Sequence, residues 1–126
     1  MNILLISHGS ALGGSPISLF NIYKHKQDKE INYHFCFGQS GPIFERVSKF
    51  NKNTIIIRHS KLFLGIPMIF KFLIYIYKND IKIIHLNTLT SYYKYPAIAS
   101  FLLKRKVIWF VRENPIEKRC VKLKFF

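Results

Sequence analysis

The first sixteen residues of the chain constrain its fold more than any other stretch. Residues 3–6 are a run of four apolar side chains that ends at Ser7-His8-Gly9. This is the length of one buried strand, too short for a membrane span, and the run lacks the basic leader of a secretory signal. The chain is therefore expected to begin with a central strand of a parallel sheet.

A glycine-rich loop follows this first strand. Gly9, Gly13 and Gly14 precede Ser15-Pro16, a pattern typical of a tight loop that leads into a helix. We expect Ser15 to cap this helix and Pro16 to be its first residue. A strand, a glycine loop and a helix N-terminus form a corner where unpaired N–H groups bind anions, so that phosphate or a sugar hydroxyl is the expected ligand. The alternative is that the glycines only let the chain turn.

The loop matches neither of the two common phosphate-binding motifs. Its glycines have the wrong spacing for G-x-G-x-x-G, and no Lys-Ser or Lys-Thr pair follows them as in a P-loop. The sequence therefore predicts neither a P-loop NTPase nor an ordinary dinucleotide-binding domain.

The rest of the chain alternates between strand and helix patterns. Further strands are expected over residues 31–37, 54–58, 81–86 and 106–111, and helices over residues 16–26, 42–50, 66–78 and 92–103. The regular part of the last helix is expected to begin near Pro96. This alternation predicts an α/β fold: a doubly wound, Rossmann-like parallel sheet of five strands in the order 3-2-1-4-5.

Two of these helices carry more specific expectations. The helix over residues 42–50 is amphipathic, with Ile43, Phe44, Val47 and Phe50 on its apolar face. Residues 62–77 are the longest apolar stretch, about 16 residues against the roughly 20 that a membrane span needs. We expect a buried crossover helix there. The alternative is an interfacial helix that dips into a bilayer.

The strand order also predicts a binding site. Winding reverses between the first and fourth strands, and ligands of such sheets bind outside the carboxyl ends of the strands at that point. Three loops meet there and supply an imidazole, hydroxyls, a guanidinium and a carboxylate. The candidate substrate-binding residues are His8, Gly13, Gly14, Asn87, Thr88, Arg112 and Glu113. Each has a purely structural alternative, and no catalytic residue is assigned.

The chain is strongly basic, with a net charge of +14, of which residues 64–126 carry +9. Nucleic acid, an anionic membrane surface or phosphorylated substrates would suit this charge, and so would ordinary solvated faces. Cys36 and Cys120 are too far apart for a C-x-x-C pair and are expected to be free thiols of a cytosolic protein. The five histidines lack metal-site spacing, so no metal is expected.

Several short segments together resemble the start of the GT-B glycosyltransferases, in particular the retaining enzymes of family 4. The segments are Gly13-Gly14, Ser18-Leu19, residues 80–87 (DIKIIHLN) and residues 107–113 (VIWFVRE). The resemblance implies that residues 1–117 form the Rossmann-like, acceptor-binding N-terminal half of a GT-B fold, and that residues 118–126 are a basic tail of a truncated chain. Many relatives have a histidine where this sequence has Arg112.

The resemblance also implies a function. Such a chain would be the acceptor-binding part of an enzyme that moves a sugar from a nucleotide sugar to a glycan or lipid-linked acceptor, in cell-envelope polysaccharide synthesis. A missing domain would hold the nucleotide sugar, so the chain alone is expected to be inactive. No cofactor and no nucleic-acid partner are expected, and the location would be cytoplasmic, peripheral at the inner face of the membrane.

Two other functions stay open. The first is a basic, non-enzymatic module that binds nucleic acid or a membrane surface; no RNP-type or zinc-finger signature supports nucleic acid. The second is a stand-alone nucleotide-binding domain, for which the glycine spacing is wrong.

Overall fold

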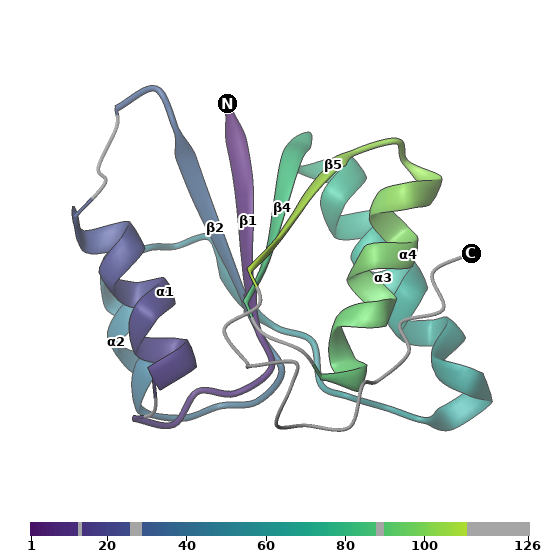
Figure 1. The fold of residues 1–126 in the computed structure, drawn as a ribbon, viewed down its shortest axis with the longest axis horizontal. Helices are drawn as coiled ribbons and strands as arrows, with labels where there is room; N and C mark the ends of the chain where they lie inside the picture. Colours follow the sequence, from purple (N-terminus) through teal and green to yellow (C-terminus); the bar gives the residue numbers. More distant parts are fainter. Residues whose placement is uncertain (13, 26–28, 88–89, 111–126) are drawn as a thin grey trace, which may run out of the picture.

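A parallel sheet of five strands forms the centre of the molecule (Figure 1). The structure is a computed structural model and describes residues 1–12, 14–25, 29–87 and 90–110. The strand order is β3-β2-β1-β4-β5, as the sequence predicts. The strands are β1 (Asn2–Ser7), β2 (Asn32–Phe37), β3 (Thr54–Ile56), β4 (Ile81–Asn87) and β5 (Lys106–Phe110).

Helices cover both faces of this sheet, as Figure 1 shows. One face carries α1 (Gly14–His25) and α2 (Pro42–Phe50). The other carries α3 (Ile66–Lys78) and α4 (Lys94–Leu102), each preceded by a short 3-10 turn, η1 (Leu62–Gly65) or η2 (Ser91–Tyr93). The predicted doubly wound α/β fold is therefore confirmed.

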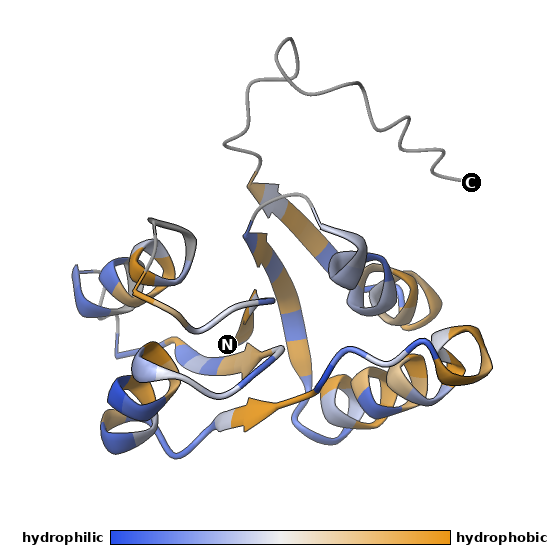
Figure 2. Cartoon of the chain, turned by 90° about the horizontal axis from the view of Figure 1, so that it is seen from below, coloured by the Kyte–Doolittle hydropathy of each residue, from blue (hydrophilic) through white to orange (hydrophobic). Residues whose placement is uncertain are grey.

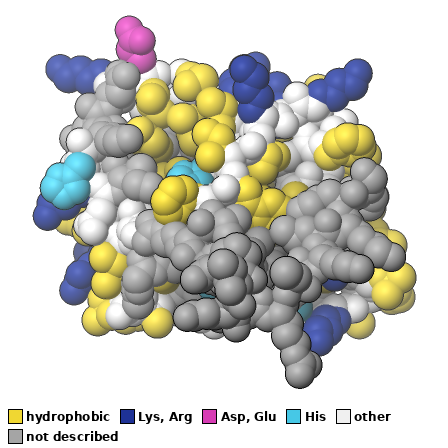
Figure 3. All heavy atoms as spheres, viewed as in Figure 1, with side chains coloured by type: hydrophobic (Ala, Val, Ile, Leu, Met, Phe, Trp, Pro, Cys, Tyr) yellow, Lys and Arg dark blue, Asp and Glu magenta, His cyan; other side chains and the backbone are white. Residues whose placement is uncertain are grey.

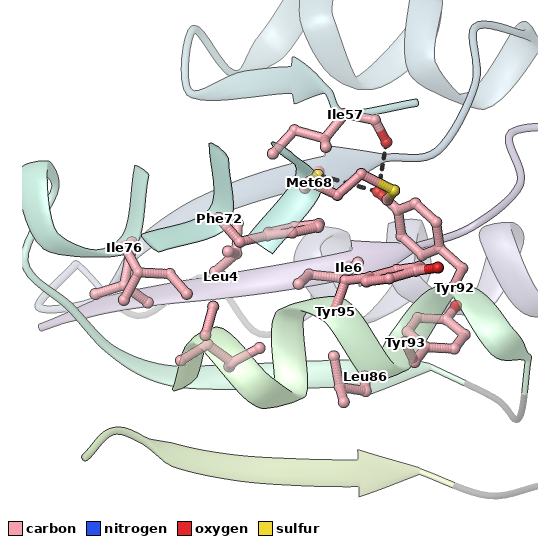
Figure 4. Packing of buried hydrophobic residues seen from close by; sticks show 14 residues of the cluster. Leu4, Ile6, Ile57, Met68, Phe72, Ile76, Leu86, Tyr92, Tyr93 and Tyr95 are labelled. Carbon is pink, nitrogen blue, oxygen red and sulfur yellow. Dashed lines mark hydrogen bonds between the residues drawn. The ribbon is translucent and has the colours of Figure 1, made fainter. Parts of the chain in front are cut away.

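The two layers create two hydrophobic cores. Successive side chains of a strand point to opposite faces, so Leu4 and Ile6 of β1 enter the core under α3 and α4, whereas Leu5 enters the core under α1 and α2. The hydropathy colouring of Figure 2 accordingly marks much of the sheet as hydrophobic. Figure 4 shows the larger core, in which Phe72 and Ile76 of α3 lie over β1.

Two helices begin earlier than their prolines predict. The first starts at Gly14 rather than at Pro16, and α4 starts at Lys94 rather than near Pro96. Both prolines are the third residue of their helix, where the N–H that proline lacks would have had no partner within the helix. Ser15 therefore lies inside α1, and the prediction that it caps the helix is wrong.

The third strand and the second helix also differ from expectation at their ends. The strand ends at Ile56 rather than at residue 58, although the Ile57 N–H still donates to the Phe37 carbonyl at 3.0 Å. In α2, Ile43 and Val47 are buried as predicted, but Phe50 is exposed. Phe50 is the last residue of α2, where the chain turns away at Asn51, so its ring has no core beneath it.

Helix α3 has the predicted bounds but not the predicted burial. Met68, Phe72 and Ile76 are buried, whereas the opposite side of the helix, including Phe70 and Ile74, is exposed. A helix that lies on one face of a sheet can bury only one of its own sides. The expected buried crossover helix is therefore present, but it is buried only on the side that faces the sheet. Within the described part of the chain, no helix is both long and apolar enough to cross a membrane.

Candidate functional site

The predicted site depends on β1 and β4 being parallel neighbours, and they are. Leu5 pairs with His85 and Ile6 with Leu86 in a parallel register. The two strands thus end at the same edge of the sheet, which is the point where the winding reverses. His8, which follows β1, and Asn87, the last residue of β4, both lie at this edge.

Tyr93 joins the ends of these two strands. The His8 N–H donates to the Tyr93 hydroxyl at 3.1 Å, and the hydroxyl donates to the Asn87 carbonyl at 2.9 Å. The hydroxyl is also 3.3 Å from Nδ1 of His8, whose ring stands edge-on to the Tyr93 ring. Because Tyr93 is fully buried, it fixes both the backbone and the ring of His8.

Tyr93 is not among the residues that the sequence motifs point to. The available signal is a cluster of tyrosines, Tyr92, Tyr93 and Tyr95, directly before and within the start of the helix that follows β4. All three are buried, and buried tyrosines usually find a hydrogen-bond partner for the hydroxyl. The Tyr92 hydroxyl also has a partner: it donates to the carbonyl of Ile57, the residue after β3, at 2.6 Å (Figure 4).

The loop after β1 also caps helix α2. The Ser10 carbonyl accepts from the Ile43 N–H at 3.0 Å, and the Ser10 hydroxyl accepts from the Phe44 N–H at 2.7 Å. These N–H groups belong to the first turn of α2, whose own N-cap is Gly41 and offers no side-chain oxygen. Ser10 thus serves as the cap from another part of the chain, and it fixes this loop against α2.

Close packing around this loop requires two further glycines, Gly38 and Gly41, which lie between β2 and α2. A Cβ on Gly38 would collide with the carbonyl oxygen of His8, and one on Gly41 would lie 2.9 Å from the carbonyl oxygen of Ser10. A Cβ on Gly9 would make only an ordinary contact, 3.7 Å from the Gln39 side chain. The close approach at this edge therefore depends on Gly38 and Gly41 more than on Gly9.

The structure places three of the seven candidate residues. His8 is partly exposed at the sheet edge, Asn87 is buried at the end of β4, and Gly14 is the first residue of α1. The other four, Gly13, Thr88, Arg112 and Glu113, lie outside the described residues. The roles assigned to all seven stay predictions.

The Cys36 thiol is buried on β2, opposite Ile6 of β1. Cys36 is a free cysteine, as expected, and is fully buried; Cys120 lies outside the described residues. Burial raises the pKa of the Cys36 thiol to about 12, so it stays protonated at neutral pH, and the thiolate is the reactive form. Among the described residues, no three His, Cys, Asp or Glu side chains are grouped so that they could hold a metal ion.

Two glycosyltransferases of solved structure share this fold. Anabaena Alr3699/HepE in complex with UDP-glucose matches with a TM-score of 0.69 at 19% identity, over 94% of this chain and 32% of that one. Its complex with UDP and glucose matches equally well, over 93% of this chain. MurG from Acinetobacter baumannii matches with a TM-score of 0.62 at 13% identity, over 86% of this chain and 34% of that one. No protein-family model and no curated protein sequence matches the chain.

This likeness confirms the expected fold. HepE and MurG are GT-B glycosyltransferases, and the described chain has the Rossmann-like α/β architecture that they contain. The chain spans about a third of the length of either protein. At such low identities the likeness shows the shared fold alone.

Proposed function

We propose that this chain forms the acceptor-binding side of the cleft of a glycosyltransferase that uses a nucleotide sugar. The observation that carries the proposal is the switch point between β1 and β4, where Tyr93 holds His8 at the edge of the sheet. The proposal is supported by the fold shared with HepE, which was solved in complex with UDP-glucose.

The proposed roles follow the chemistry of each side chain. His8 and Asn87 would bond acceptor hydroxyls, and the backbone at Gly13 and Gly14 would lie close to the donor diphosphate. Arg112 would pair with Glu113 or with a phosphate of the acceptor. These residues bind and orient substrates, and no residue of the chain is proposed as the catalytic group.

We further propose that residues 1–117 form this acceptor-binding domain and that a second domain is needed for turnover. Sugar transfer requires the donor and the acceptor to be held in contact, and this orientation supplies much of the rate. With one side of the cleft alone, substrates bind weakly and are not positioned. The acceptor would be a glycan or a lipid-linked sugar of the cell envelope, handled on the cytoplasmic side.

Backbone NMR of the ¹⁵N-labelled 126-residue chain tests this proposal. Titration with UDP-glucose and with a panel of soluble oligosaccharides should move the amide signals of residues 8–12 and of Tyr93. His8→Ala should remove the response to the oligosaccharides. Shifts confined to β5 or to α2 would contradict the proposed site.

Further assays on the 126-residue chain distinguish sugar transfer by the chain alone, nucleotide binding and nucleic-acid binding. Incubation of the chain with UDP-glucose and an acceptor should give no sugar transfer, and measurable transfer would show that no second domain is needed. Micromolar binding of a free nucleotide would instead favour a stand-alone nucleotide-binding domain. Binding of single-stranded RNA with a steep salt dependence would favour a nucleic-acid module.

A further inference from the structure

An unusually apolar surface lies along η1 and α3. Seven large hydrophobic side chains of this segment are between 49% and 87% exposed. We call them the apolar band: Leu62, Phe63, Leu64, Ile66, Phe70, Ile74 and Tyr77. Contiguous apolar surfaces of this kind mark interaction sites in folded proteins, whereas single exposed hydrophobic residues need no explanation.

The band is one continuous stripe because of helical periodicity. Ile66, Phe70 and Ile74 are four residues apart, and such residues lie above one another on one side of a helix. The opposite side of α3 is held in the core by Met68 and Phe72. The orientation of the stripe is therefore fixed by core packing, and it faces away from the sheet.

A strained turn holds the end of the band away from the core. Phe63, Leu64 and Gly65 have φ values of 49°, 56° and 77°, and side chains disfavour this left-handed region. Gly65 packs directly against the Tyr95 ring, which leaves no room for a Cβ. The turn thus keeps two bulky hydrophobic residues in solvent at a conformational cost, and such strain is typical of functional positions.

The stretch that carries the band is basic, and the acid that follows it, Asp80, is paired with Lys82 and Arg105. Residues 46–79 include no Asp or Glu, and Arg58, Lys61, Lys71 and Lys78 in this stretch are exposed. Lys71 and Lys78 are seven residues apart, so they lie on the same flank of the stripe. Figure 3 shows the same balance on the face that it presents, where Lys and Arg side chains lie around the rim and acidic side chains are sparse.

We propose that the apolar band is a docking surface for an anionic phospholipid bilayer. Leu62, Phe63 and Leu64 would enter the boundary between headgroups and acyl chains, and α3 would lie in the plane of the membrane. The flanking lysines would bind anionic headgroups while their stems cover apolar surface. A second copy of this chain fits less well, because two equally basic surfaces repel each other.

The η1 end of the apolar band lies at the same edge of the sheet as the candidate site. The connection from the carboxyl end of β3 to α3 contains η1, and the loops after β1 and β4 leave the sheet at the same edge (Figure 1). Docking through η1 would therefore bring this edge towards the lipid. The docking proposal itself rests on the band and its charge, and it stands or falls independently of sugar transfer.

Co-sedimentation of the full 126-residue chain with lipid vesicles tests the proposal. Vesicles of phosphatidylcholine with about 30 mol % phosphatidylserine should bind the chain, and pure phosphatidylcholine vesicles should bind it much less. The double variant Phe63→Asn/Leu64→Asn should lower the partition coefficient by about tenfold or more. Asparagine tolerates the left-handed region, so this variant keeps the turn while it removes the apolar side chains.

The chain offers matched control variants for the apolar side chains of the band and for the lysines beside it. Phe50 and Leu102 are the same residue types as Phe63 and Leu64 and are also exposed, but they lie at the C-terminal ends of α2 and α4. Phe50→Asn/Leu102→Asn should therefore leave binding within about twofold of the parent. For the charge, Lys71→Gln/Lys78→Gln should weaken binding to the anionic vesicles, whereas Lys24→Gln/Lys49→Gln on the other face of the sheet should do so much less.

A fluorescent reporter locates the contact directly. Phe63→Trp should be quenched by brominated lipids in the anionic vesicles, and Phe50→Trp should not. Vesicle binding that is equal for the band variant and the parent would overturn the proposal. So would a parent chain that is dimeric in solution and becomes monomeric with Phe63→Asn/Leu64→Asn, because the band would then be an interface between copies.

Discussion

The hydroxyl of Tyr93 lies 3.1 Å from the main-chain nitrogen of His8, although 85 residues separate them in sequence. The same hydroxyl donates to the Asn87 carbonyl, so a single oxygen atom ties the ends of β1 and β4 together. In a doubly wound sheet this is the place where ligands bind. A buried tyrosine thus sets the shape of the candidate site without being available to a ligand itself.

Tyr93→Phe removes this oxygen and keeps the ring. The His8 N–H and the Asn87 carbonyl each lose a partner, so the free energy of unfolding should fall by about 1–3 kcal/mol. Urea denaturation followed by circular dichroism measures the change. Tyr77→Phe is the control, because the Tyr77 side chain is exposed on α3, and its stability should stay within about 0.5 kcal/mol of the parent. Equal stability of the two variants would show that the Tyr93 bonds contribute nothing.

Ser10→Ala should weaken the attachment of the loop after β1 to helix α2, because only the backbone bond from Ile43 then remains. The Ser10 hydroxyl is the side-chain acceptor for the Phe44 N–H, and loss of such a cap costs about 1 kcal/mol. Hydrogen exchange at the first turn of α2 should speed up along with the loss of stability. Ser48→Ala is the matched control, because Ser48 is exposed within the same helix and alanine is the better helix former there. Unchanged exchange at Phe44 in Ser10→Ala would contradict the capping role.

The sheet and its order could be predicted from local patterns. The apolar runs of β1, β4 and β5 and the β-α alternation leave few topologies, because crossovers are short and right-handed. The helix starts could not be placed as well, since proline at Pro16 and Pro96 is compatible with several positions in a first turn. The error at each end is about one turn of helix or less.

The contacts that shape the site could not be predicted, because they join distant segments. Ser10 caps a helix 34 residues away, and Gly38 matters through the backbone of His8. Neither residue stands out by its own neighbours in sequence. Which side of α3 the core leaves exposed could not be predicted for a related reason: apart from Lys71, residues 62–77 are almost entirely apolar, so periodicity does not distinguish the buried side from the exposed side.

Two glycine substitutions test the steric account of the loops. Gly65→Ala places a Cβ in the left-handed region and against the Tyr95 ring, and overpacking alone should cost about 1–3 kcal/mol. Gly9→Ala meets only an ordinary contact at 3.7 Å, and it should change the free energy of unfolding by less than about 0.5 kcal/mol. Thermal denaturation of both variants provides the comparison. A larger loss for Gly9→Ala would reverse the assignment of which glycine is required.

The buried histidine of β2 should make stability depend on pH. His34 is 5% exposed, its Nδ1 lies 2.8 Å from the Tyr75 hydroxyl, and burial lowers the pKa of the His34 imidazole below its usual 6.5. Below pH 6.5 the unfolded chain therefore binds a proton that the folded chain does not. The free energy of unfolding should be highest above pH 6.5 and should fall as the pH drops towards the lowered pKa, by at most about 1.4 kcal/mol per pH unit from this residue.

Two variants separate the effect of His34 protonation from that of the His34–Tyr75 hydrogen bond. Denaturation curves of His34→Leu and Tyr75→Phe are measured between about pH 5 and 7.5, which brackets the usual histidine pKa of about 6.5. In His34→Leu the free energy of unfolding should depend less on pH, because leucine does not titrate. Tyr75→Phe should be less stable by about 1 kcal/mol at neutral pH and should keep a slope, because the imidazole stays buried. The phenol itself adds no slope in this range, since burial raises the pKa of Tyr75 to about 12. Parallel curves for His34→Leu and the parent would show that His34 is protonated equally in the folded and unfolded chains.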